Sequence, residues 1–129
     1  MDPAADTTPT APSVLLIDDV DATRTGLADL LRLRGYKAHE AANAMDGLRI
    51  LREERGVRVI VLDVVLPGAS GFWFREQQMH DPAIAGIPVI LFTGAADVDG
   101  PTPLAVDEVV HKPLAVGRLL ELLAHYCEH

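Results

Sequence analysis

Three short runs of apolar residues give the chain its most regular pattern. They are Val14–Ile17, Val59–Leu62 and Val89–Phe92, and each contains β-branched side chains. Runs that are apolar at every position, rather than at every second one, are typical of strands covered on both faces. Short buried helices can produce similar runs, but four-residue cores bounded by turn residues favour strands. The three runs therefore predict a parallel sheet placed between helices.

Helical patterns fill the segments between these strands. Leu27, Leu30 and Leu31 recur at i, i+3 and i+4, and Gly35 follows as a stop signal. Asn43 is a suitable N-cap for a second helix. The sequence predicts two further helices, over 71–80 and after residue 113, and two weaker strands, over 36–40 and 107–111.

Strand and helix alternate along the chain, which predicts the α/β fold class with an open sheet and right-handed crossovers. One crossover is unusual, because residues 94–106 include the sequence Gly-Pro-Thr-Pro at 100–103. Since proline and glycine break helices, we expect a loop here, or at most one or two helical turns. A helix between the fourth and fifth strands is thus predicted to be short or absent.

The composition is that of a single globular domain. The chain has 129 residues, 49% of them hydrophobic, which suffices to bury a core without metals or disulfides. Residues 1–12 contain three prolines and no large aliphatic side chain except Met1, so we interpret them as a flexible tail before a domain over 13–129. The longest apolar stretch, 83–92, is too short for a membrane span. We expect no separate output domain after residue 126.

Charge and cysteine content narrow the function classes. Nineteen acidic side chains against eleven basic ones give a formal net charge of −8. This balance argues against nucleic acid as a partner, because phosphates are bound by cations. The one cysteine, Cys127, cannot form an internal disulfide, and no signal peptide is visible. We therefore expect a cytoplasmic location without membrane attachment.

The polar residues that end the predicted strands carry the candidate chemistry. Asp18 and Asp19 follow the first apolar run, Asp63 follows the second and Thr93 the third, while Lys112 ends the last strand. Ligands bind at the carboxyl ends of the strands in open parallel sheets, so these side chains should converge on one edge. Three neighbouring carboxylates repel one another unless a cation lies between them, and oxygen ligands suit Mg²⁺. Taken alone, the acidic pair could also cap a helix.

This arrangement resembles the receiver domain of bacterial two-component response regulators. The resemblance rests on the five groups just named, in that order, with Leu66-Pro67-Gly68 after Asp63 and Pro113 after Lys112, and it covers residues 13–126. It implies a flavodoxin-like, doubly wound sheet of five parallel strands in the order 2-1-3-4-5, with helices on both faces. It also implies a signalling switch with no enzyme activity beyond weak self-dephosphorylation. Because we expect no output domain after residue 126, we expect this switch to be a stand-alone one.

The resemblance assigns a role to each group. Asp63 is the phosphoacceptor, which takes a phosphoryl group from the phosphohistidine of a sensor histidine kinase or a histidine phosphotransfer protein. Thr93 offers a hydroxyl donor and Lys112 a cation to the phosphoryl oxygens. Pro113 is expected to follow a cis peptide bond.

A Mg²⁺ site, with Mn²⁺ as a substitute, is also implied by the resemblance. Its ligands are Asp18, Asp19, Asp63 and the backbone carbonyl of Val65, with Asp18 acting largely through water. The metal offsets the repulsion between the carboxylates and the charge on the transferred group.

The sequence departs from the family pattern on the side of the fifth strand. Val109 stands three positions before Lys112, where the family has an aromatic residue that acts with Thr93 as a switch. Gly94 follows Thr93, and the segment before the fifth strand is about one helical turn short. These features resemble an atypical receiver subfamily in which Thr-Gly and a reduced fourth helix replace the ordinary output face. We expect an unidentified downstream protein to recognise the phosphorylated state.

Of two other function classes, an adaptor stays open and a phosphatase is disfavoured. A receiver-like adaptor would dock partners without being phosphorylated, and Val109 and the short crossover agree with it. A phosphatase with an aspartate nucleophile would want a second acid two residues later, where this chain has Val65, so that class is disfavoured.

The remaining features concern surfaces. His125 and His129 have the spacing of a transition-metal site, but a fraying chain end is the better interpretation. The aromatic run 72–74 cannot point inward at every position, so at least one side chain should be exposed. Leu122 widens the apolar stripe of the last helix, which indicates self-association as a homodimer.

Overall fold

The computed structural model of the chain describes residues 11–94, 106–111 and 116–128. Five strands and four helices lie in these ranges. They are β1 (Ser13–Ile17), α1 (Asp21–Leu33), β2 (Lys37–Ala41), α2 (Ala44–Glu53), β3 (Val57–Leu62), α3 (Gly71–Met79), β4 (Val89–Thr93), β5 (Glu108–His111) and α4 (Val116–Glu128). The label α4 thus denotes the last helix of the chain and not a helix between β4 and β5.

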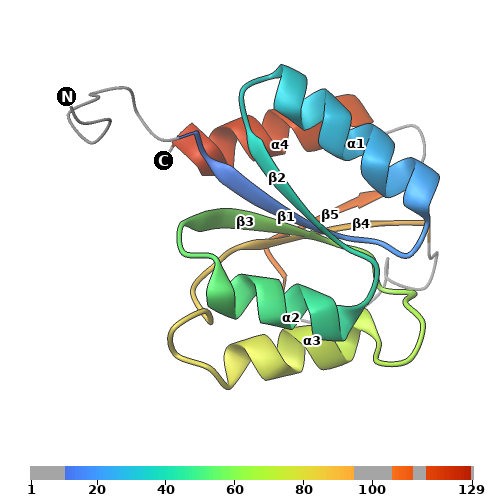
Figure 1. Ribbon diagram of the computed structural model, residues 1–129, viewed down its shortest axis with the longest axis vertical. Helices are drawn as coiled ribbons and strands as arrows, with labels where there is room; N and C mark the ends of the chain where they lie inside the picture. Colours follow the sequence, from blue (N-terminus) through green and yellow to red (C-terminus); the bar gives the residue numbers. More distant parts are fainter. Residues whose placement is uncertain (1–10, 95–105, 112–115, 129) are drawn as a thin grey trace.

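The five strands form one parallel sheet in the order β2-β1-β3-β4-β5. Helices α1 and α4 cover one face of the sheet and α2 and α3 cover the other, so the sheet is the middle of three layers (Figure 1). The predicted fold class, strand order and helices on both faces are confirmed.

Strand β1, which lies between β2 and β3, supplies side chains to a core on each face of the sheet. Val14 and Leu16 belong to the core under α1 and α4, whereas Leu15 and Ile17 belong to the core under α2 and α3. None of the four is more than 2% exposed. Side chains of a strand alternate between the two faces, so a strand between two helical layers is apolar throughout. Each such burial contributes on the order of 2 kcal/mol.

Local signals fix several helix ends. Oδ1 of Asn43 accepts a hydrogen bond from the backbone N–H of Asp46 at 2.8 Å, which confirms the predicted cap of α2. Gly35 follows α1 with a φ of 92°, a left-handed conformation that suits glycine. Ser70 caps α3 by accepting a hydrogen bond from the backbone N–H of Trp73 at 3.2 Å.

Four boundaries of the weaker strands and of the third helix differ by one residue from those predicted. Strand β2 covers 37–41 instead of 36–40, helix α3 ends at Met79 instead of His80, and β5 begins at Glu108 instead of Asp107. Strand β2 lies at the edge of the sheet, where most of its side chains are only half-buried. An edge strand therefore carries a weaker apolar pattern than a central one.

Two predictions about apolar side chains have opposite outcomes. Phe72 is 38% exposed and Phe74 is fully buried, so the aromatic run is divided between surface and core as expected. Leu122, by contrast, is 6% exposed and packs in the core under α1 and α4. The interpretation of Leu122 as a self-association surface is wrong, because α4 uses its wide apolar stripe within its own domain.

Some predictions concern residues outside the described ranges. They are the tail over 1–12 apart from its last two residues, most of the segment 94–106 with its short or absent helix, and Lys112, Pro113 and His129. At the border of the tail, the carbonyl of Pro12 accepts a hydrogen bond from the backbone N–H of Lys37 at 2.9 Å. None of the described helices is both long and apolar enough to cross a membrane.

Candidate functional site

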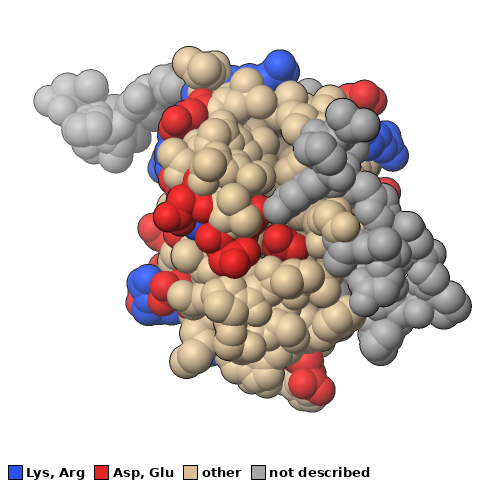
Figure 2. Space-filling view, turned by 90° about the vertical axis from the view of Figure 1, so that its right-hand side faces the viewer, with Lys and Arg blue, Asp and Glu red and all other residues tan. Residues whose placement is uncertain are grey.

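The carboxyl ends of β1, β3 and β4 bring together polar residues that the sequence singles out. Asp18 and Asp19 follow β1, Asp63 follows β3, and Thr93 is the last residue of β4. One carboxylate oxygen of each aspartate lies within 4.8 Å of those of the other two. Figure 2 faces this edge of the sheet and shows acidic side chains gathered near the middle of the surface. The convergence expected from the sequence is present for these four residues.

Asp63 lies at the centre of this group with its side chain held in place. Its backbone N–H donates to the carbonyl of Ile17 at 2.9 Å, which prolongs the pairing of β3 with β1. Its Oδ1 accepts hydrogen bonds from Oγ1 of Thr93 at 2.8 Å and from the backbone N–H of Val65 at 3.1 Å. The residue is 7% exposed. The two hydrogen bonds fix the rotation of a carboxylate that solvent still reaches.

The acidic pair after β1 places its two carboxylates differently. Asp18 is 7% exposed, and its Oδ1 accepts a hydrogen bond from the backbone N–H of Val20 at 2.9 Å. This contact closes a local turn. Asp19 is exposed. The N-cap position of α1 is Val20, without a side-chain cap, so the pair does not act as the helix cap that its composition alone suggests.

The donor set fits a hard divalent cation. Three carboxylates at this spacing repel one another, and a cation among them relieves the repulsion. The group contains carboxylate oxygens without histidine or cysteine, which suits Mg²⁺ or Mn²⁺ better than Zn²⁺. Within the described ranges, it is the one group of three or more such side chains close enough to share an ion.

The loop between Asp63 and α3 is packed closely against the site. Gly68 has a φ of 72°, which side chains with a Cβ rarely adopt. Gly71 donates its N–H to the carbonyl of Val64 at 3.1 Å. A Cβ on Gly71 would lie 2.6 Å from the carbonyl oxygen of Asp63 and 2.9 Å from Cα of Val64. The first residue of α3 is thus held against the backbone that carries Asp63.

The other predicted site residues are only partly described. Val65 reaches Asp63 through its backbone N–H and is 64% exposed, while metal binding by its carbonyl stays a prediction. Val109 pairs with Leu91 of β4 and is 38% exposed. An aliphatic side chain therefore occupies the position of the switch aromatic that the resemblance implies. Lys112 and Pro113 lie outside the described residues.

Two residues beside the site have little or no signal in the sequence. Nη1 of Arg24 donates to the backbone carbonyl of Asp18 at 2.8 Å, a contact without any signal in the sequence because every residue carries a carbonyl. Gly71 is marked in the sequence only as the first residue of a predicted helix, and the close approach to the backbone of Asp63 and Val64 is visible in the structure alone.

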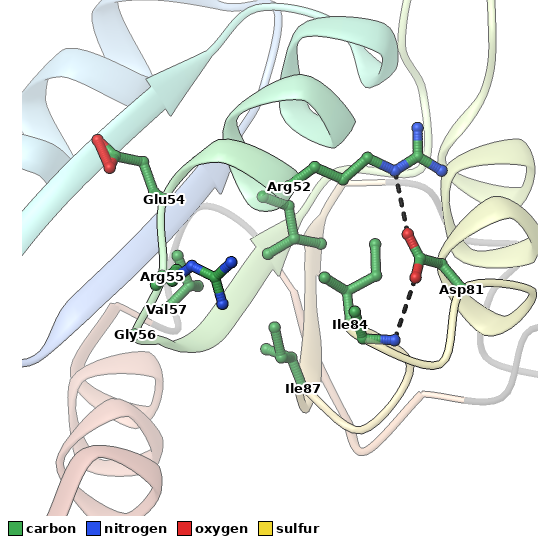
Figure 3. A pocket seen from close by; sticks show the side chains of 10 residues that line it. Arg52, Glu54, Arg55, Gly56, Val57, Asp81, Ile84 and Ile87 are labelled. Atoms are coloured by element: carbon green, nitrogen blue, oxygen red, sulfur yellow. Dashed lines mark hydrogen bonds and ion pairs between the residues drawn. The ribbon is translucent and has the colours of Figure 1, made fainter.

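A pocket of about 410 Å³ lies at the opposite edge of the sheet, where β3 begins (Figure 3). Nε of Arg52 lies 3.2 Å from Oδ2 of Asp81, and Oδ1 of Asp81 accepts a hydrogen bond from the backbone N–H of Ala83 at 3.1 Å. These contacts join α2 to the segment before β4. Arg52 and Asp81 thus hold two segments of the fold together in this pocket. The aspartate edge is therefore the better candidate site.

Comparison with known proteins identifies related sequences. A model described as the response regulator receiver domain matches residues 14–124. The transcriptional regulatory protein AfsQ1 of Streptomyces coelicolor is 42% identical over 114 residues. That alignment covers 85% of this chain and 48% of AfsQ1, so the chain spans about half the length of this relative.

Solved structures share the fold over most of the chain. A response regulator receiver protein from Pseudomonas putida matches with a TM-score of 0.83 and 26% identity, covering 92% of this chain and 99% of that one. The response regulator TrrA from Thermotoga maritima, solved in complex with Mg²⁺ and BeF, matches with a TM-score of 0.79 and 23% identity. The second match covers 89% of this chain and 98% of that one, and at this identity it concerns the fold alone.

Proposed function

Since the chain belongs to the response regulator receiver domain family, we propose that it is a phosphoacceptor switch in which Asp63 takes a phosphoryl group from a phosphohistidine. The donor is a sensor histidine kinase or a histidine phosphotransfer protein. The observation that supports this proposal is the setting of Asp63, a 7% exposed carboxylate bonded to Thr93 with two more carboxylates within 4.8 Å. Receiver domains are signalling switches, and we assign this one no turnover beyond weak self-dephosphorylation.

The transfer is a displacement at phosphorus. A carboxylate oxygen of Asp63 attacks, the new P–O bond forms while the P–N bond to the imidazole breaks, and the electron pair of that bond returns to the ring nitrogen. The hydrogen bonds from Thr93 and Val65 orient the carboxylate before attack, which lowers the entropic part of the barrier. The Thr93 hydroxyl is then a donor beside the acyl phosphate, and we assign it the switch contact.

In this proposal Asp18, Asp19 and Asp63 hold Mg²⁺, with Mn²⁺ as a substitute. The backbone carbonyl of Val65 is a further ligand. When bound, the ion neutralises charge on the carboxylates and on the transferred group. The three carboxylates, whose oxygens lie within 4.8 Å of one another, support this assignment.

The remaining parts of the proposal concern partners and location. Lys112 supplies a cation to the phosphoryl oxygens, and the phosphorylated state is read out by contacts with a downstream protein or a second copy of the chain. Nucleic acid is not a partner of this chain, given its net charge of −8. A cytoplasmic location is proposed because the chain has one cysteine, which is too few for an internal disulfide.

Intact-mass spectrometry tests the proposal. The wild-type chain, Asp63→Asn and Asp29→Asn are incubated with phosphoramidate and Mg²⁺. Asp29 is a matched control, because its side chain is 68% exposed on α1 and its substitution makes the same change in charge. We expect one added phosphoryl group on the wild type and on Asp29→Asn, and none on Asp63→Asn or after chelation of Mg²⁺. An unmodified wild-type mass, or modification of Asp63→Asn to the same extent as the wild type, would contradict the proposal.

A receiver-like adaptor that binds partners without phosphorylation is the second candidate. The exposed aliphatic Val109 favours it, because the family places its switch aromatic at this position. Titration with Mg²⁺ separates the two candidates. A working phosphoacceptor binds the ion, with a change in Trp73 fluorescence or in thermal stability, whereas an adaptor with an inert site shows neither.

A further inference from the structure

Arg24, in the first turn of α1, joins three segments near the acidic edge. Its side chain is only 12% exposed. Nη1 donates to the backbone carbonyl of Asp18 at 2.8 Å, Nη2 lies 2.8 Å from Oδ1 of Asp21, and Nε lies 3.1 Å from Oε1 of Glu40. A guanidinium group presents donors in a rigid fork, which lets one side chain hold the β1–α1 loop, the start of α1 and β2 together.

The contact with Asp18 acts on the peptide that leads into Asp19. The carbonyl of Asp18 and the N–H of Asp19 belong to the same planar peptide group, so fixing the carbonyl fixes the direction in which the chain enters Asp19. The side chain of Asp18 has its own tie to the backbone N–H of Val20. Among the described residues, no hydrogen bond or ion pair is found for the side chain of Asp19. Its placement beside Asp63 therefore depends on the backbone before it.

The charge of Arg24 does not compete with a cation at the acidic edge. Asp21 and Glu40 both pair with the guanidinium group, so Arg24 and its two partners together carry a net negative charge. The ion pair between Arg24 and Asp21 contributes little to the stability of the fold, because the side chain of Asp21 is 83% exposed. The charged fork instead gives the peptide of Asp18 a firm donor without bringing a net positive charge to the site.

We propose that Arg24 is a positioning residue, which holds the Asp18–Asp19 peptide in the orientation needed to bind Mg²⁺ at the acidic edge. This inference rests on the proposed function. Groups that orient metal ligands typically change metal affinity about 10- to 100-fold when they are removed. Removal of the Arg24 fork is therefore expected to weaken Mg²⁺ binding about tenfold or more.

Arg32 is a matched control on the same helix. Its Nη2 lies 3.3 Å from Oε2 of Glu40 and donates to the carbonyl of Ala38 at 2.7 Å, and its Nη1 lies 3.5 Å from Oδ1 of Asp29. Arg32 thus shares Glu40 with Arg24, while none of its contacts in the described chain involves Asp18 or Asp19. Arg24→Gln and Arg32→Gln remove the same charge from the same cluster, and only the first also releases the Asp18 peptide.

The experiment measures Mg²⁺ affinity and stability separately. The full-length wild type, Arg24→Gln, Arg24→Lys and Arg32→Gln are titrated with MgCl2 by calorimetry, and each is unfolded in urea with the metal chelated. We expect the Mg²⁺ Kd to rise about tenfold or more in Arg24→Gln and to stay within about twofold of the wild type in Arg32→Gln. Arg24→Lys should restore only part of the affinity. One ammonium group can contact the Asp18 carbonyl or Glu40, but it cannot span both.

A second readout separates positioning from general damage to the fold. At saturating Mg²⁺, Arg24→Gln should reach the wild-type extent of phosphorylation by phosphoramidate, with only the Mg²⁺ requirement raised. Should Arg24→Gln not fold, Arg24→Lys against Arg32→Gln gives the same comparison. Equal Mg²⁺ affinities in the Arg24 variants and the wild type overturn the inference and leave the proposed function intact. A wild-type chain that binds no Mg²⁺ overturns both.

Discussion

Asp19 is the exposed member of the acidic group, whereas Asp18 and Asp63 are each 7% exposed. Its substitution by asparagine removes one of three mutually repelling charges and disturbs little packing. Without Mg²⁺ we expect Asp19→Asn to raise the free energy of unfolding slightly, by less than about 1 kcal/mol. With Mg²⁺ the order should reverse, because an ion at 100 times its Kd stabilises the wild type by about 2.7 kcal/mol.

Urea unfolding with a chelator and with excess MgCl2 measures the free energy of unfolding of the wild type and of Asp19→Asn without and with the ion. Loss of stability in Asp19→Asn under both conditions would contradict the idea that the three carboxylates repel one another. An equal response of both chains to Mg²⁺ would remove Asp19 from the metal site.

Thr93 is fully buried and donates its hydroxyl hydrogen to Oδ1 of Asp63. Thr93→Val keeps the shape of the side chain but leaves a buried carboxylate oxygen with one donor fewer. We expect the free energy of unfolding to fall by about 1–3 kcal/mol. Thr25→Val is the matched control, since Thr25 donates to Oε1 of Glu40 at an exposed position and should cost less than about 1 kcal/mol. Equal losses in the two variants would argue against a special role for the buried pair.

Gly71 is the residue on which the fit of α3 against Asp63 depends. In Gly71→Ala the added Cβ meets backbone atoms at 2.6 and 2.9 Å, so the loop or the helix must shift. Overpacking of this kind costs about 1–3 kcal/mol, and the shift should also slow phosphorylation of Asp63. Gly26→Ala in α1 is the control: nothing lies within 4 Å of its Cβ, and alanine should add about 0.5–1 kcal/mol of stability. If both variants behave alike in chemical denaturation, the close approach at Gly71 is not structural.

Among the elements, α1 and β2 are joined through Glu40. Burial by itself raises the pKa of this carboxyl, but hydrogen bonds from Arg24, Thr25 and Arg32 outweigh it and hold the pKa below its ordinary value of 4.5. Because the folded pKa lies below the unfolded one, the stabilisation is present above about pH 4.5 and is lost as the pH falls through the folded value.

Glu40→Gln should therefore destabilise the chain at neutral pH by roughly 0.5–1 kcal/mol, and its difference from the wild type should shrink below pH 4.5. Unfolding free energies measured from pH 7 to pH 3 give this difference directly. Glu53→Gln serves as a control on α2, where Glu53 pairs with Arg49 and is 61% exposed. A constant difference between Glu40→Gln and the wild type across the whole range would contradict the assigned pKa shift.

The elements also show what a sequence can and cannot specify. Strands β1, β3 and β4 are predictable because burial on both faces leaves a local, unbroken apolar run. The buried polar residues of α3 are not: Nε2 of Gln78 donates to the carbonyls of Ile84 and Ile87 at 2.9 Å each, and Arg75 donates to Oε1 of Gln78 at 2.7 Å. Backbone carbonyls exist at every position, so no residue pattern marks these partners.

At the scale of the whole molecule, the sheet separates two apolar cores, and the aspartates lie at its edge beyond both. The site is predictable from the sequence because all the strands are parallel and therefore end at the same edge of the sheet. The net charge of −8 gives no such information by itself. It does not distinguish Asp18, Asp19 and Asp63 from acids on the solvated surface.

The proposed function requires that Asp63 is the residue that carries the phosphoryl group. After reaction with phosphoramidate and Mg²⁺, borohydride reduces an acyl phosphate to an alcohol and so marks the modified aspartate, which peptide mapping by mass spectrometry then locates. We expect the reduced residue at position 63, and no reduced residue when Mg²⁺ is chelated. A mark on Asp18, Asp19 or any other residue, or a phosphorylated chain without one, would contradict it.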